Sequence, residues 1–175
     1  MSGQRRLLLD KSVVRRYFEG ISALARGLVL AEEEQQAILL VHLARSKGQR
    51  LFVSIEMFNL LQAHRHQIAP AEALMFLKRV EVLYPGCYFK RWARRLREKT
   101  FTREDAKVLA LGTFGTDEAG RILGVHVIAT YDRPMLRKWQ RERDEITERL
   151  LDMTGNLQAP FAQARLPDVR LPENV

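Results

Sequence analysis

Short apolar runs alternate along the chain with longer stretches in which apolar side chains recur every three or four positions. The runs at residues 6–10, 50–54, 80–84 and 125–131 predict four buried strands. Helical spacing predicts helices at residues 12–26, 31–47, 55–63, 70–78, 88–99, 102–114 and 134–153. Strands separated by helical crossovers pair in parallel. The order therefore predicts an α/β fold, with three α/β/α layers around a central, mainly parallel sheet of four to five strands.

One domain is the simplest organisation, because the chain contains no internal repeat, low-complexity segment or clear linker. Its 175 residues are enough to form one hydrophobic core. We assign residues 1–153 to this domain. Residues 154–175 carry Pro160, Pro167 and Pro172, and we expect them to form an extended C-terminal tail.

The composition favours a cytoplasmic protein with a polyanionic partner. The net charge of +8 is most simply explained by nucleic-acid binding. The single cysteine, Cys87, excludes an intramolecular disulfide and fits a reducing compartment. No apolar stretch is long enough for a membrane span, and the N-terminus lacks the apolar region of a secretory signal, so we expect no membrane association.

Four acidic residues lie where this fold would bring distant segments together. Asp10, Glu56 and Asp132 are at or just past the C-terminal ends of predicted strands, and Asp105 is in the first turn of a predicted helix. In open parallel sheets, ligands bind at the carboxyl ends of the strands. Carboxylates gathered there repel one another unless a cation or protons intervene. The sequence therefore suggests a carboxylate-lined site for a divalent metal ion.

Each of these acids also has a local alternative role. Asp10 could cap the next helix, and Glu56 could interact with the dipole of its own helix. Asp105 lies three residues after Thr102, the spacing of a capping box, and Asp132 suits a turn before a helix that starts with proline. The metal site rests on the joint pattern, since all four acids fall at one edge of the predicted sheet.

The chain resembles PIN-domain nucleases in four short motifs, and within that group it is most similar to the single-domain VapC-like toxins. The family pattern is an aspartate followed by a hydroxyl residue, then a glutamate, then two further aspartates. The matching segments, in this order, are Leu8-Leu9-Asp10-Lys11-Ser12, Ser54-Ile55-Glu56, Thr102-Arg103-Glu104-Asp105-Ala106 and Ala129-Thr130-Tyr131-Asp132.

The resemblance implies a PIN-like fold and a Mg²⁺- or Mn²⁺-dependent endoribonuclease. Its catalytic and metal-binding residues would be Asp10, Glu56, Asp105 and Asp132. It also implies a homodimer and the role of a toxin restrained by an antitoxin protein. Many relatives carry a further acid or asparagine after the last aspartate. Here the sequence continues with Arg133-Pro134-Met135, so a second metal position is left open.

Hydroxyl and basic residues complete the predicted site. Ser12 and Thr130 would orient the carboxylates, although capping and strand composition explain them equally well. The predicted RNA-binding residues are basic side chains near the acids or on the helix at residues 88–99, namely Lys11, Arg15, Arg16, Arg91, Arg94, Arg95 and Arg133. Trp92 and Trp139 lie among such basic residues, and would either stack on bases or pack inward.

Two other functions fit the same sequence. The first is a nucleic-acid-binding or assembly module with a PIN fold and a weakened or absent active site. The second is a phosphatase or phosphotransferase, but the segment Asp10-Lys11-Ser12 lacks the paired Asp-x-Asp nucleophile motif. Cleavage of RNA in the presence of manganese would distinguish the nuclease from both.

Overall fold

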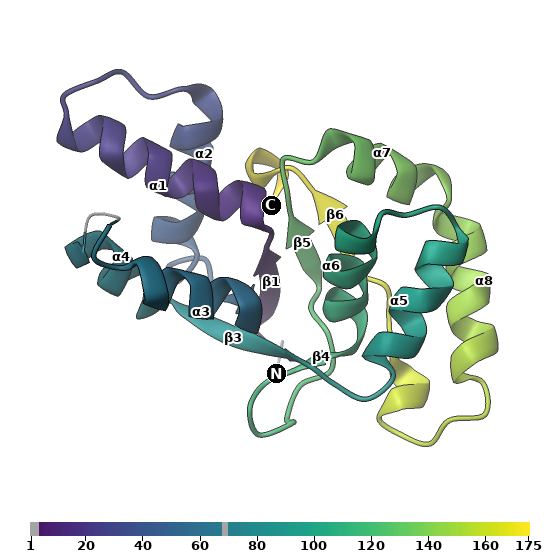
Figure 1. Ribbon diagram of the computed structural model, residues 1–175. Coiled ribbons are helices and arrows are strands. Elements are labelled where there is room, and N and C mark those ends of the chain that lie inside the picture. Colours follow the sequence, from purple (N-terminus) through teal and green to yellow (C-terminus); the bar gives the residue numbers. More distant parts are fainter. Residues whose placement is uncertain (1–3, 68–69) are drawn as a thin grey trace.

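The computed structural model describes residues 4–67 and 70–175 (Figure 1). This part of the chain forms an α/β fold, as predicted, with eight α-helices and a six-stranded sheet. The strands are β1 (Arg5–Leu9), β2 (Gln49–Ser54), β3 (Val80–Pro85), β4 (Gly115–Thr116), β5 (Val127–Ala129) and β6 (Asp168–Arg170). The helices are α1 (Lys11–Ala25), α2 (Glu32–Leu43), α3 (Ile55–His64), α4 (Pro70–Leu77), α5 (Phe89–Glu98), α6 (Arg103–Phe114), α7 (Arg133–Arg141) and α8 (Arg143–Thr154).

The sheet order is β4-β3-β2-β1-β5-β6, and every neighbouring pair is parallel except β3 with β4. The central strand β1 pairs with β2 on one side and β5 on the other, so that Leu7 lies opposite both Leu51 and Val127. The chain changes direction of winding at β1, which makes the gap between β1 and β5 the topological switch point.

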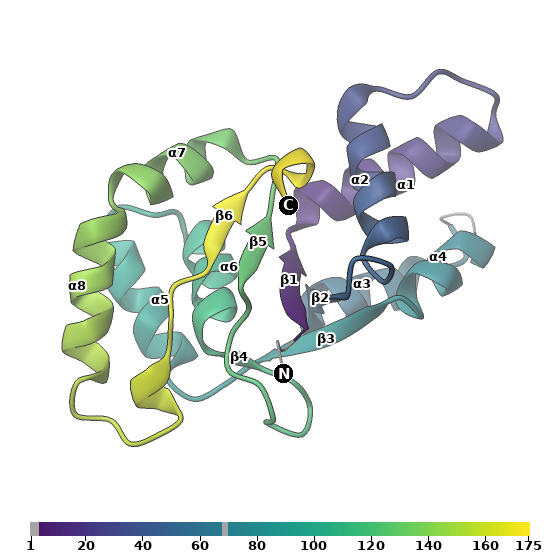
Figure 2. The same cartoon turned by 180° about the vertical axis from the view of Figure 1, so that it is seen from behind.

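Alternation along β1 separates two hydrophobic layers. Leu7 and Leu9 pack with apolar residues of α1, α2 and α4, whereas Leu8 packs with those of α5, α6 and α8 on the other face. Figures 1 and 2 show α1 to α4 on one side of the sheet and α5 to α8 on the other. This is the predicted three-layer arrangement.

The sheet has six strands rather than the four to five expected. The two short additions are β4, in the glycine-rich segment after α6, and β6, in the predicted tail. Val169 of β6 is only 4% exposed, and β6 covers the edge of β5. Open strand edges carry unpaired backbone groups, so this pairing satisfies the outer side of β5.

The segment predicted as an extended tail is thus part of the folded sheet. The backbone N–H of Thr130 donates to the carbonyl of Arg170, which continues the pairing past the end of β5. Trp139 Nε1 and Arg143 both donate to the carbonyl of Pro167, at 3.2 and 2.6 Å. Residues from 166 onward are therefore held by α7, α8 and β5 together.

The predicted long helix at residues 134–153 is divided into α7 and α8. The chain leaves the helical conformation at Glu142, whose φ and ψ are −100° and 11°. Trp139 and Ile146 are both buried although they lie on opposite sides of this break. No proline or glycine marks the position, so the apolar periodicity continues through it.

In residues 4–67 and 70–175, none of the helices combines the length and apolar character that a membrane crossing requires.

Candidate carboxylate site

Asp10 is a buried carboxylate at the switch point between β1 and β5. It is 7% exposed, and it precedes α1 without making a side-chain cap. Its Oδ2 accepts hydrogen bonds from the hydroxyls of Ser12, at 2.7 Å, and Thr130, at 2.9 Å. A buried carboxylate requires such donors. The two bonds fix its orientation, while Oδ1 lies outside them.

The same two hydroxyls tie the end of β1 to the end of β5. Ser12 Oγ accepts from the backbone N–H of Tyr131, and Thr130 Oγ1 accepts from that of Asp132, both at 3.0 Å. Each hydroxyl therefore donates to Asp10 and accepts from the loop that leads into α7. This network couples the position of Asp10 to that of Asp132, and the role of Ser12 and Thr130 in orienting metal ligands stays a prediction.

Asp132 caps α7 from the same loop. Its Oδ1 accepts from the backbone N–H of Met135 at 2.9 Å, which is a standard N-terminal cap. The local alternative considered for this residue is therefore present in the structure. One carboxylate oxygen serves the helix, and the side chain remains partly exposed.

Asp105 lies within electrostatic range of both other aspartates. Burial raises the pKa of its carboxyl, and the negative charges of Asp132 and Asp10 raise it further, while hydrogen bonds with Thr102 act in the opposite direction. Thr102 caps α6 by accepting from the backbone N–H of Asp105 at 3.1 Å. The fold thus brings three of the four predicted acids to one edge of the sheet.

Glu56 is exposed, whereas the three aspartates are buried or partly exposed, and it lines a pocket together with Asp10. Its side chain is 73% exposed and forms an ion pair with Lys107 of α6, with 3.4 Å between Lys107 Nζ and Glu56 Oε1. The residue lies in the first turn of α3, which Ser54 caps. Sequence reasoning did not single out Lys107. Its position two residues after Asp105 was the available signal.

Carboxylate oxygens are the donors that Mg²⁺ and Mn²⁺ prefer, and the mutual repulsion at Asp105 is a cost that a cation would relieve. Within the described residues, no three His, Cys, Asp or Glu side chains form a ready-made group for a metal ion. Magnesium keeps several of its waters and needs only one or two direct carboxylates. The donor chemistry of Asp10, Asp105 and Asp132 fits such an ion. Glu56 would have to leave Lys107 to join them.

The basic residues predicted to bind RNA fall into three groups. Lys11 and Arg133 are exposed and directly follow Asp10 and Asp132 in the chain. Others are engaged in ion pairs: Arg16 with Glu19 and Glu33, and Arg95 with Asp152, while Arg15 pairs with Glu19. Arg91 and Arg94 are exposed on α5.

Both tryptophans pack inward, which removes them as stacking platforms for RNA. Trp92 is 0% exposed and Trp139 is 1% exposed. Trp92 contacts Phe114 edge to face, and Trp139 contacts Phe101 in the same manner. Of the two alternatives from the sequence, inward packing is the observed one. The charged residues of α5 and α7 lie around these two buried tryptophans.

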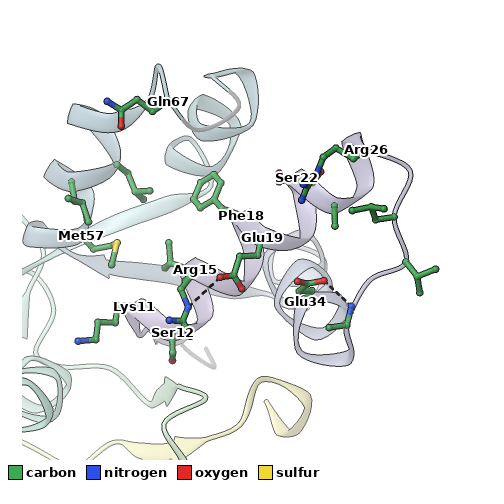
Figure 3. A pocket seen from close by; sticks show the side chains of 17 residues that line it. Lys11, Ser12, Arg15, Phe18, Glu19, Ser22, Arg26, Glu34, Met57 and Gln67 are labelled. Atoms are coloured by element: carbon green, nitrogen blue, oxygen red, sulfur yellow. Dashed lines mark hydrogen bonds and ion pairs between the residues drawn. The ribbon is translucent and has the colours of Figure 1, made fainter.

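An open cavity of about 1070 Å³ lies between α1, the loop that follows it and α3 (Figure 3). Phe18 of α1 and Met57 of α3 contribute apolar side chains to it. Leu28 and Val29 of the loop line it as well, and they are 51% and 95% exposed. Lys11 lies at this cavity and also at the carboxylate edge.

No protein-family model matches the chain, and no curated protein matches it significantly. The resemblance to PIN-domain nucleases therefore depends on the four short sequence motifs alone.

Proposed function

We propose that this chain is a metal-dependent endoribonuclease with a PIN-like fold. The observation that carries the proposal is the hydrogen-bond network that joins Asp10 at the end of β1 to the loop of Asp132 after β5, with the Asp105 carboxyl, whose pKa is raised by burial and then by the charges of Asp132 and Asp10, close enough to be affected by both. Like-charged groups gathered at the ligand-binding edge of a parallel sheet mark a functional site more often than a structural one.

A bound Mg²⁺ or Mn²⁺ would supply charge neutralisation at the phosphate and a more acidic water. The residues of the chain provide the rest. Ser12 and Thr130 hold the Asp10 carboxylate rigid and tie it to the loop of Asp132. Such fixed orientation of charged groups avoids reorganisation during the reaction. Asp105 presents its carboxylate from α6, on the other side of the site.

The substrate is the phosphodiester backbone of RNA, which would approach the aspartates past the exposed basic residues Lys11 and Arg133. Lys11 and Arg133 are exposed next to the aspartates and would position a phosphate there. The net charge of +8 favours a polyanion over a small neutral substrate. The choice of RNA over DNA comes from the resemblance to the VapC-like toxins.

The deciding experiment is cleavage of single-stranded RNA by the purified protein with added manganese. We expect Asp10→Asn to reduce the cleavage rate by at least about a hundredfold, because the neutral amide does not hold a cation, although its oxygen can still accept from both hydroxyls. Asp144→Asn changes an exposed aspartate on α8 in the same way and should leave the rate within about twofold. Equal rates for the two variants would contradict the proposal.

A second candidate is a nucleic-acid-binding module with a weakened active site. The ion pair between Glu56 and Lys107 favours it, since this pair engages the fourth predicted acid with a cation of the chain itself. Tight RNA binding without cleavage under the same conditions would support this candidate instead.

Protein partners belong to the same proposal. We propose that the chain forms homodimers and is restrained by an antitoxin-like protein. Exposed Leu28 and Val29 support an apolar contact of this kind, because large apolar side chains at the surface often mark protein interfaces.

A further inference from the structure

An apolar pocket of about 350 Å³ opens directly beside Asp10. Leu8 of β1, Leu83 of β3, Val108 and Leu111 of α6, and the ring of Phe89 of α5 form one side of it. Ile55 and Met57 of α3 close it from the other direction. Pockets of this size, apolar inside with a few polar groups at the rim, are typical ligand sites.

Five charged residues line this pocket as well. Lys11 and Lys107 are the cations, and Asp10, Glu56 and Glu104 are the carboxylates. Lys107 pairs with Glu56 and lies 4.0 Å from Glu104, whereas Lys11 is exposed and forms no ion pair among the described residues. The pocket therefore offers apolar walls to a flat group, with Lys11 as the cation for an anionic group attached to it.

We propose that the pocket receives one unpaired nucleobase of the RNA strand whose phosphate lies at Asp10. The inference rests on the proposed function, because the carboxylate site fixes where that phosphate lies. A nucleobase has an apolar face for the walls at Phe89 and Val108, and its attached phosphate meets Lys11. Contact between a base and an aromatic side chain stabilises binding through the face of the base.

This pocket makes the protein selective for unpaired RNA. A base in a duplex must break its pairing and stacking before it enters such a pocket, which costs a few kcal/mol, whereas a base in a single strand is already free. The walls shown by the structure are apolar, so the contact depends on the face of the base and tolerates different bases. The substrate class is therefore single-stranded or looped RNA.

The test compares binding of two single strands of equal length and charge, a short oligouridylate and an abasic ribose-phosphate strand. Both are measured by fluorescence anisotropy in EDTA, so that the result does not depend on hydrolysis. We expect the wild-type protein to bind the oligouridylate about tenfold more tightly or better. Val108→Trp fills the pocket and should abolish this preference without weakening binding of the abasic strand.

Leu151→Trp is the matched control, because Leu151 of α8 is 65% exposed and lines neither of the two cavities described. It should keep the full preference. Phe89→Leu retains apolar volume but removes the ring, and should reduce the preference by several fold, which covers the case in which Val108→Trp does not fold. A preference for bases that survives in folded Val108→Trp, or is absent from the wild type, would overturn the inference.

Manganese-dependent cleavage, measured separately, distinguishes this inference from the proposed function. Loss of the base preference in Val108→Trp supports the pocket even if neither the wild type nor any variant cleaves RNA. That result would contradict only the proposed nuclease activity. Cleavage that depends on Asp10 but shows no base preference in binding refutes the pocket alone.

Discussion

At the scale of single residues, Asp105 carries a charge that the folded state disfavours. Its carboxyl has a raised pKa because of burial and because of Asp132 and Asp10. The folded protein therefore loses stability relative to the unfolded chain as the pH rises from the ordinary aspartate range, near 3.9, through the raised value. We expect Asp105→Asn to raise the thermal midpoint at pH 7, by about 2–4 °C for each kcal/mol of repulsion removed.

The gain should disappear at about pH 3.5, where the wild-type carboxyl is protonated in both states. Differential scanning calorimetry at the two pH values measures the difference. Asp144→Asn, at an exposed position in the first turn of α8, should give no gain at pH 7. A thermal midpoint for Asp105→Asn equal to or below that of the wild type at pH 7 would show that the charge of Asp105 does not destabilise the folded protein.

Divalent ions provide a second prediction at this scale. A cation that binds only the folded protein stabilises it by mass action, by about 2.7 kcal/mol at a hundred times its dissociation constant. We therefore expect manganese to raise the midpoint of the wild type by several degrees and that of Asp10→Asn by much less. An equal increase in both proteins would indicate ion binding elsewhere. The blank is the same buffer with EDTA and no free divalent ion.

At the scale of elements, the C-terminal strand β6 depends on a few specific contacts. Arg143 donates to the carbonyls of Pro167 and Leu166 and lies 3.6 Å from Asp168. We expect Arg143→Ala to lower the free energy of unfolding by about 1–3 kcal/mol, since the part-buried carbonyls of Leu166 and Pro167 lose a charged donor. Urea denaturation measures this loss, and hydrogen exchange should accelerate at residues 168–170.

The control is Arg141→Ala, two positions earlier. Its side chain is 72% exposed and pairs only with the adjacent Glu142 among the described residues. Surface pairs of this kind contribute little, so this variant should stay within about 0.5 kcal/mol of the wild type. If both variants unfold alike and exchange at β6 is unchanged, Arg143 does not hold the strand.

At the scale of the whole molecule, we expect RNA binding to depend on where the basic residues lie more than on the net charge. Arg133 follows Asp132 at the carboxyl edge of the sheet, whereas Arg45 follows α2 near the start of β2, at the opposite edge. We expect Arg133→Ala to weaken binding of single-stranded RNA and to reduce the slope of log affinity against log salt by about 0.7, the value for one phosphate contact.

Arg45→Ala removes the same charge and should leave that slope unchanged. Titrations at several salt concentrations in EDTA measure both variants without hydrolysis. Equal loss of slope in the two proteins would mean that RNA responds to net charge alone and does not approach the carboxylate edge.

The amino-acid sequence by itself determined the α/β class, the order of the main elements and the placement of Asp10 and Asp132. Apolar runs and helical spacing indicate which side chains are buried. The carboxyl ends of parallel strands lie at the same edge of the sheet, which places the residues that follow them together. The tertiary structure decided the pairing of β6 with β5, the break between α7 and α8, the inward packing of Trp92 and Trp139, and the ion pair between Glu56 and Lys107. Each of these depends on contacts between segments far apart in the chain, and local periodicity carries no information about the partner.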